Sequence, residues 1–316
     1  MIEHLPNPVQ FGLFVTPLRD DLNRVHELTQ AAEARGFDYI SIQDHPYEST
    51  FLDSLALIGV LIGQTRRLRF MSNVANLPLR PPAMLAKAGA TLDALSGWRF
   101  ELGIGGGARW DEIAGLGGTR RTPAETVAAT DEAITVVRTM WNPRRVANFS
   151  GAHYTLTDAD TGPAPAHRIG IWLSAGGQRM LGLVGRAADG WIAPVMTNYE
   201  TKAAAQDRID AAARAAGRAP TEIRRVIQLV GQVTDRATTT GRPRRGPGIQ
   251  PIQTTPDGWA DIITEFVLEE RFDTVNFLPE NPDPDQVSRF ADEVIPRTVA
   301  ALSQTTDHGR WRDPTT

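Results

Sequence analysis

The sequence predicts an α/β fold, a (β/α)8 TIM barrel with two insertions, and three observations support it. Segments with strand-like composition alternate eight times with segments of helical period. The strand segments are too apolar for a sheet with one face in water, which favours parallel strands covered by helices. The length of 316 residues suits one large barrel, so we expect residues 1–316 to form a single domain.

Four strand and helix units are expected in the amino-terminal half of the chain. Apolar segments predict strands at residues 10–17, 37–45, 68–76 and 98–107. Helical spacing predicts helices at residues 20–36, 53–64, 82–97 and 122–141, with Gly36 and Gly97 as stop signals. In the third helix, one face is expected to carry the apolar residues Met84, Leu85, Ala88, Leu92 and Leu95.

The carboxyl-terminal half continues the alternation and holds both insertions. Strands are expected at 168–177, 190–195, 223–233 and 272–280, and helices at 178–190, 199–218, 258–270 and 283–302. Residues 143–168 lack a helical period and hold several turn formers, which predicts a short hairpin and loop. Residues 234–256 are rich in Thr, Arg, Gly and Pro and too polar to pack, which is typical of a functional or disordered loop.

Composition and charge narrow the function classes. Apolar residues make up 41% of the chain, and no window reaches the ~18 uninterrupted apolar residues of a membrane helix. The net charge of -4 gives no overall field that would attract nucleic acid. Cysteine is absent and the six histidines show no ligand spacing, so no metal site is expected. An acid and two prolines near the amino terminus are unlike a secretory signal, so we expect a cytoplasmic protein.

Polar and glycine-rich residues gather where four predicted strands end. They are Asp44 and His45, Ser72 and Asn73, the run from Gly103 to Gly107, and the run from Ser174 to Gly177. Because a barrel places its chemistry at the carboxyl ends of its strands, we expect these residues to share one site. His45 is the candidate proton donor or acceptor and Asp44 its tuning partner, with a simple loop-capping pair as the alternative.

Two glycine-rich segments are candidates for binding a cofactor. Gly103, Gly105 and Ala108 satisfy a dinucleotide fingerprint, but residues 109–121 look like a loop, without the helix that such a site needs. We favour instead a close backbone approach to a flat ligand, with a plain flexible turn as the alternative. The segment LSAGGQRM places glycines at a junction between a strand and a helix, where free amides can bind a phosphate, with Arg179 nearby.

Three segments together make the chain resemble the bacterial luciferase-like monooxygenase superfamily, barrel oxidoreductases that use flavin mononucleotide (FMN) or the deazaflavin F420. They are AAEARGFDYISIQDHPY, PPAMLAKAGATLDALSGWRFELGIGGG and IWLSAGGQRMLGLVGRAADGWI. An Asp-His pair at the end of the second strand resembles the F420 branch, because Glu-His is frequent in the FMN branch. The resemblance therefore implies an F420-dependent oxidoreductase that transfers a hydride between the deazaflavin and a small organic substrate.

The resemblance also implies roles for site residues. Ser72 and Asn73 match a bulge that supports the central ring of the cofactor, with a non-proline cis peptide at or beside them. The glycines Gly103, Gly105, Gly106 and Gly107 would lie along the ring, and Gly176, Gly177 and Gln178 would hold the phosphate. From their positions beside this segment, Ser174 and Arg179 are also candidate cofactor-binding residues. Residues 234–256 resemble the family's mobile lid. We expect Arg242, Arg244 and Arg245 in it to face an anionic ligand, with a solvated basic loop that contacts nothing as the alternative.

One departure limits what the resemblance implies about the substrate. The sugar-phosphate dehydrogenase branch has a glutamate where this chain has Ala108, so that branch's substrate is not carried over. Two alternatives stay open, an FMN-dependent monooxygenase that uses reduced flavin and oxygen, and a non-catalytic protein that binds the deazaflavin or flavin. A homodimer is the candidate assembly.

Overall fold

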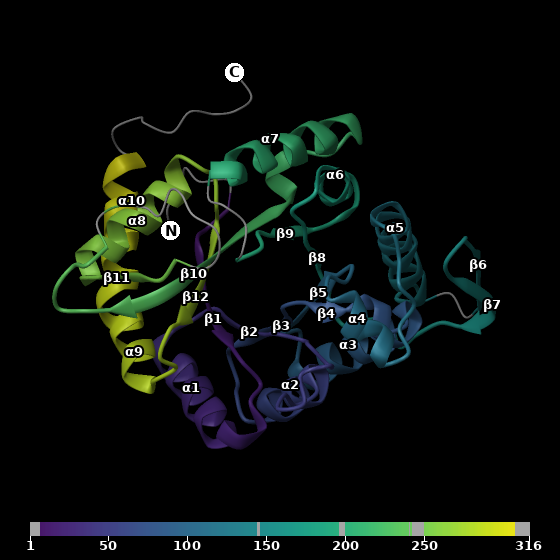
Figure 1. Ribbon diagram of the computed structural model, residues 1–316, viewed down its shortest axis with the longest axis horizontal. Helices are drawn as coiled ribbons and strands as arrows, with labels where there is room; N and C mark the ends of the chain where they lie inside the picture. The colour runs from purple at the N-terminus through teal and green to yellow at the C-terminus, as the bar shows by residue number, and fades with distance from the viewer. Residues whose placement is uncertain (1–6, 144–145, 196–199, 240, 242–249, 307–316) are drawn as a thin grey trace.

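Eight parallel strands of the computed structural model close into a barrel (Figure 1). The structure describes residues 7–143, 146–195, 200–239, 241 and 250–306. The barrel strands are β1 Gln10–Val15, β2 Tyr39–Ile42, β3 Arg69–Ser72, β5 Phe100–Gly105, β8 Ile171–Ser174, β9 Gly190–Ile192, β10 Arg224–Val233 and β12 Thr274–Pro279. They pair in chain order, and β12 returns to β1, which confirms the predicted (β/α)8 fold.

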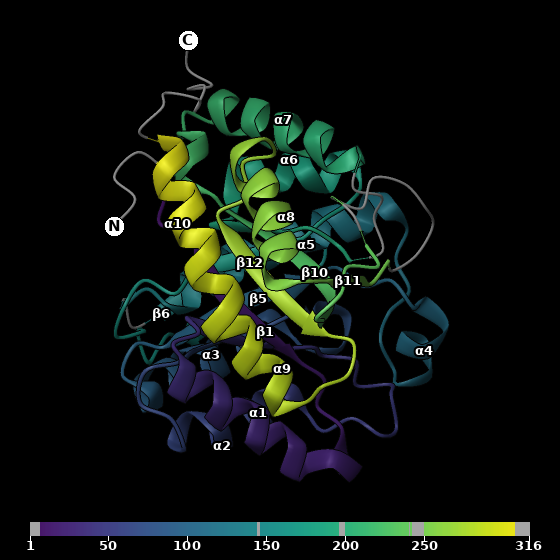
Figure 2. The ribbon, with the colours of Figure 1, turned by 90° about the vertical axis from the view of Figure 1, so that its left-hand side faces the viewer.

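Helices surround the strands on the outside of the barrel (Figures 1 and 2). They are α1 Leu22–Arg35, α2 Ser54–Gly63, α3 Pro82–Ser96, α5 Pro123–Met140, α6 Gln178–Ala187, α7 Glu200–Ala215 and α8 Pro256–Leu268, followed by α9 Pro284–Arg289, a π-helical turn Phe290–Val294 and α10 Ile295–Thr306. Gly36 and Gly97 end α1 and α3 with left-handed backbones, as predicted, because glycine has no Cβ to clash there.

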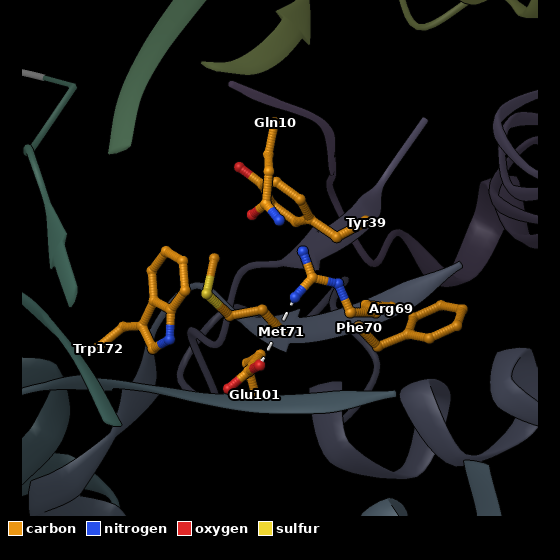
Figure 3. Close-up of a pocket in the computed structure, with 7 residues that line it drawn as sticks. All are labelled: Gln10, Tyr39, Arg69, Phe70, Met71, Glu101 and Trp172. Atoms are coloured by element: carbon orange, nitrogen blue, oxygen red, sulfur yellow. Dashed lines mark ion pairs between the residues drawn. The ribbon is translucent and has the colours of Figure 1, made fainter. Parts of the chain in front are cut away.

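The barrel interior is packed, and its amino-terminal end is closed by side chains. Tyr39, Met71 and Trp172 form an apolar cluster inside the strands. Figure 3 shows these side chains around a cavity of about 10 Å³, with an ion pair of 3.8 Å between Arg69 and Glu101 beside them. This space holds about one water molecule and is too small for a larger ligand.

The face predicted for α3 is wrong for two of its residues. Leu85 and Leu92 are buried, whereas the side chains of Met84 and Leu95 are 63% and 71% exposed. The physical reason is that the small residues Ala86, Gly89 and Ala90 share the side of the buried leucines and pack toward the barrel, with Gly89 next to Phe100 of β5. The helix therefore turns its small residues to the barrel and leaves a second apolar stripe outside.

The first insertion matches its prediction, and two connecting segments do not. Residues Val146–Ser150 and Thr155–Asp160 form the antiparallel hairpin β6–β7, which lies beyond α5 at the edge of the molecule (Figure 1). The segment expected to be too polar to pack contains β11, Ile252–Thr254, which pairs with β10 because Ile252 is apolar and fully buried. The segment expected as a loop after β5 contains the short helix α4, Trp110–Gly115, which buries Ile113.

Candidate active site

The predicted site residues lie at the carboxyl ends of β2, β3, β5 and β8. These four strands are neighbours in the barrel, in that order. Because all of them are parallel, their ends open at one mouth of the barrel. The structure thus brings the two pairs and the two glycine runs to the same end of the fold. The side chains of these residues make different interactions there.

Asp44 is buried and fully engaged by hydrogen bonds. Its Oδ2 accepts hydrogen bonds from the backbone N–H of Asn76, at 2.8 Å, and from Nε of Arg80, at 2.7 Å. Its Oδ1 accepts a further bond of 2.7 Å from Nη2 of Arg80. This two-pronged ion pair ties the end of β2 to the segment that leads into α3, so Asp44 holds the loop that carries His45.

Arg80 links this ion pair to the start of the next helix. Its Nη2 also contacts Oδ2 of Asp53, at 2.6 Å, and Asp53 caps the N-terminus of α2. Burial alone would lower the pKa of Arg80, but the hydrogen bonds and charges of Asp44 and Asp53 raise it. The arginine therefore stays charged and holds two loop segments together.

The imidazole of His45 is half-buried among aromatic rings. Its ring centroid lies 5.5 Å from that of Tyr47 and 6.3 Å from that of Phe51, with both rings nearly parallel to it. Burial and then the charge of Arg109 lower the pKa of His45, against the opposing effects of Asp44 and Glu48. A histidine with a lowered pKa is neutral near pH 7 and is able to accept a proton.

The side chains of Ser72 and Asn73 form hydrogen bonds with other residues of the protein. The Oγ of Ser72 donates to the carbonyl of Gly103, at 2.8 Å, and accepts from its N–H, at 3.1 Å. The amide of Asn73 points into the barrel and donates to Gln228, at 2.8 Å, and to Ser41, at 3.2 Å. The peptide bond between Asn73 and Val74 is cis, at the position that the resemblance implied.

The glycines of the β5 end make room for neighbouring protein atoms. A Cβ on Gly103 would lie 2.0 Å from the carbonyl oxygen of Ser72, and one on Gly105 would lie 2.6 Å from Val74. Gly106 faces Thr126 in the same way. These contacts explain why glycine is needed here, and the approach of this run to a planar ligand stays a prediction.

A cavity of about 740 Å³ adjoins this run and reaches the start of α6. Gly107, which has a positive φ of 102°, lies on one side of it, and Gly177, Gln178 and Arg179 lie on the other. Trp110, Thr122 and Met180 complete much of the wall. The structure thus places the end of one predicted glycine run opposite the other, across a space large enough for part of a cofactor.

The start of α6 has the properties of an anion site. The ten-residue helix begins after Gly177, and no side chain of the described residues caps its N-terminus. Its first amides have no partner within the helix and carry the positive end of the helix dipole. Gly176, Gly177, Gln178 and Arg179 are exposed, while Ser174 is half-buried. An ideal Cβ on Gly177 has no described atom within 4 Å, so this position faces open space.

Two arginines of the mouth, Arg109 and Arg80, were not selected from the sequence. Arg109 forms ion pairs with Glu48 and, at 2.9 Å, with Glu112, and its guanidinium lies 4.7 Å from the ring centroid of Tyr47. The position of Arg109 directly after the glycine run was the available signal. Arg80 had none, because its partner Asp44 lies 36 positions earlier in the chain.

The remaining expectations concern metals, membranes and the lid. Among the described residues, no group of three or more His, Asp or Glu side chains is arranged to hold a metal ion. Within the same residues, none of the helices has the length and apolar character needed to span a membrane. Arg242, Arg244 and Arg245 of the predicted lid lie outside the described residues.

The family model for luciferase-like monooxygenases matches residues 7–240. The chain belongs to this family. A search of curated proteins finds the F420-dependent glucose-6-phosphate dehydrogenase of Segniliparus rotundus, 32% identical over 193 residues, which cover 58% of this chain and 57% of that protein. It also finds the F420-dependent hydroxymycolic acid dehydrogenase of Mycobacterium tuberculosis, 31% identical over 244 residues, with 73% of this chain and 65% of that one covered.

The match thus spans 57% of the length of the Segniliparus rotundus relative, less than two thirds of that protein. Among solved structures, an F420-dependent secondary alcohol dehydrogenase in complex with an F420-acetone adduct superposes with a TM-score of 0.78. The superposition covers 92% of this chain and 99% of that chain at 19% sequence identity. A likeness at this identity shows a shared fold and leaves the reaction to be argued from the site.

Proposed function

We propose that this member of the family is an F420-dependent oxidoreductase that transfers a hydride between the deazaflavin and a small organic substrate. The observation that carries the proposal is His45, a histidine with a lowered pKa at the barrel mouth, on a loop fixed by the ion pair between Asp44 and Arg80. The names of the curated relatives support the choice of F420 over FMN. When bound, F420 supplies the hydride chemistry.

The described residues fit the phosphate and tail of such a cofactor. The open cavity between Gly107 and the start of α6 has the uncapped amides of a helix N-terminus at one end. Gly177 and Gln178 would hold a phosphate there, with Arg179 as a supporting cation. An aspartate at position 177 has room, since the Cβ position is open, but its charge would repel a phosphate. We expect Gly177→Asp to weaken cofactor binding about tenfold or more, and Gly177→Ala to leave it nearly unchanged.

In this proposal His45 accepts and donates the proton, and Asp44 positions His45. In the oxidative direction, a ring nitrogen of neutral His45 would accept the proton of the alcohol O–H while the bound cofactor supplies the hydride chemistry. The reverse direction returns the same proton to the product oxygen. Asp44 has its oxygens bonded to Asn76 and Arg80, so we assign it to holding the His45 loop.

The residues at the barrel mouth indicate the class of the substrate. Ala108 carries no acid, and the nearby Glu112 is held by Arg109. We therefore propose a small alcohol or carbonyl compound and do not carry over the sugar phosphate of the relatives.

An anaerobic turnover assay tests the proposed function. The protein is incubated with oxidised F420 and a panel of primary and secondary alcohols, and reduction of F420 is followed by its absorbance. We expect reduction with at least one alcohol. The FMN alternative, favoured by the family's monooxygenase name, instead predicts oxygen consumption that tracks product formation with reduced FMN. Tight F420 binding without turnover of any substrate would indicate a non-catalytic binding protein.

We also propose a homodimer that covers the outer faces of α2 and α3. The two helices pack against each other, and α2 contains no charged residue. Val60, Met84 and Leu95 are exposed large apolar side chains on these two helices. A helix that is apolar on all sides is normally buried, so a second copy of the chain would complete its burial. Light scattering should give a dimer mass, and Leu95→Arg should convert the dimer to a monomer.

The remaining parts of the proposal rest on the sequence. The net charge of -4 supports a protein that does not bind nucleic acid. A cytoplasmic location likewise stays a prediction.

A further inference from the structure

Four planar groups from two loops form a connected stack at the barrel mouth. The loop after β2 supplies Phe51, His45 and Tyr47, whose rings lie within 17° of parallel to the imidazole. The loop after β5 supplies Arg109, whose guanidinium carbon lies 4.7 Å from the Tyr47 ring centroid. Each group in the stack thus lies beside the next and limits the room that the His45 ring has to rotate.

Ion pairs hold the Arg109 end of this stack. Arg109 pairs with Glu48 of the β2 loop and, at 2.9 Å, with Glu112 of α4. The N–H of Glu48 donates to the carbonyl of His45 at 2.9 Å, so this glutamate is anchored to the histidine's own backbone. The two loops are thereby joined through one arginine.

The charged groups around His45 act in opposite directions. Asp44 and Glu48, on its own loop, favour the protonated ring, whereas Arg109 disfavours it. Asp44 is neutralised by Arg80, which also holds Asp53, and Glu112 contacts Arg109 on the far loop. In the part of the chain that the structure describes, Arg109 is the cation that acts on the imidazole.

We propose that Arg109 is a positioning residue for His45, which clamps Tyr47 over the imidazole and keeps the ring fixed and uncharged at the barrel mouth. This inference rests on the proposed role of His45 as the proton carrier. Arg109 thereby couples the loops after β2 and β5. Loss of its charge leaves Glu48 unpaired beside the ring and favours the imidazolium.

The test is an NMR titration of the histidine ring C–H signals in the protein without cofactor, with the His45 signal assigned from His45→Ala. We expect Arg109→Gln to raise the pKa of His45 by about 0.5 or more, and Glu48→Gln to lower it. Arg109→Lys keeps the charge but lacks the planar group, so it should preserve most of the low pKa while broadening the His45 signal.

Arg120→Gln is the matched control, because Arg120 pairs with Asp111 near α4 and does not contact the stack. It removes the same charge and should leave the titration of His45 unchanged. Equal titrations in Arg109→Gln, Arg120→Gln and the wild type would overturn the proposal. The opposite shift expected in Glu48→Gln keeps the test decisive where one variant folds poorly.

A second readout separates this inference from the proposed function. In the oxidative direction, the acid limb of the kcat/KM profile should move to higher pH in Arg109→Gln, by the same amount as the NMR titration. If the pKa of His45 from NMR changes in Arg109→Gln but the kcat/KM profile does not, His45 is not the proton carrier. The role of Arg109 in catalysis is then refuted as well.

Discussion

Asp44 and Arg80 form a buried ion pair at the barrel mouth. Arg80→Gln would leave the Asp44 carboxylate, which is 2% exposed, without its charged partner. An uncompensated buried charge typically costs about 3 to 5 kcal/mol, so we expect a loss of that size in the free energy of unfolding.

Urea denaturation measures this loss, with Arg19→Gln as the control. Arg19 pairs with Asp20 at the surface, where both side chains are more than 70% exposed. Such pairs contribute about 0 to 1 kcal/mol, so the control should unfold close to the wild type. Equal stabilities of the two variants would contradict the role assigned to Arg80.

The proton role of His45 is tested by its removal. We expect His45→Ala to lower turnover by about 10² or more while F420 affinity changes by a few fold, because the ring acts on the substrate's proton. His26→Ala is a matched control, since His26 lies on the outer surface and bonds to Gln64. Turnover of His45→Ala close to that of the control would return His45 to a structural role.

Secondary structure elements were largely predictable from the sequence, for a physical reason. Buried parallel strands need continuous apolar runs and their helices need an apolar stripe, and both patterns are local. The exceptions are segments whose local sequence pattern is compatible with more than one structure. In α3 both Leu85 and Leu95 lie on apolar stripes, and the tertiary packing of the helix on the barrel buries the stripe with Leu85 and Gly89. β11 is three residues long, too short to show a period.

The candidate site likewise has features that could be predicted from the sequence and features that could not. The positions of His45, Asp44 and the glycine runs at the barrel mouth could be predicted, because each lies at or just after the end of a strand, whereas their roles stay predictions. The ion pair of Asp44 with Arg80 and the stack of Arg109 on Tyr47 join residues from different loops. Such pairs depend on loop conformation, which no period encodes.

The connection between the hairpin and β8 carries a pH-dependent clamp. Nδ1 of His167 lies 2.6 Å from Asp93 of α3, and its other nitrogen lies 3.8 Å from Glu101 of β5. The nearby Glu101 and the charge of Asp93 raise the pKa of His167 against the effect of burial. A raised pKa stabilises the fold fully below about pH 6.5, the unfolded value, and the gain disappears as pH rises through the folded pKa.

His167→Gln should therefore cost more stability at pH 6 than at pH 9. Urea unfolding of the wild type and the variant at both pH values measures the difference, with His26→Ala as the control. A cost that is equal at both pH values, or larger at high pH, would show that the protonated ring does not hold the clamp.

At the scale of the whole molecule, the barrel joins early and late parts of the chain. β12 pairs with β1, and α10 packs against α8, as Figure 2 shows on one side of the molecule. Because the first and last strands of the barrel pair with each other, we propose that residues 1–316 act as one domain. The carboxyl ends of its strands then form the mouth at which cofactor and substrate meet.

The central claim is that this mouth binds the deazaflavin in preference to FMN. The most direct measurement is a fluorescence titration of the cofactor-free protein with F420 and with FMN, side by side in the same buffer. We expect tighter binding of F420, and weakening of that binding in Gly177→Asp but not in Gly177→Ala. Equal affinities, or tighter binding of FMN, would contradict it.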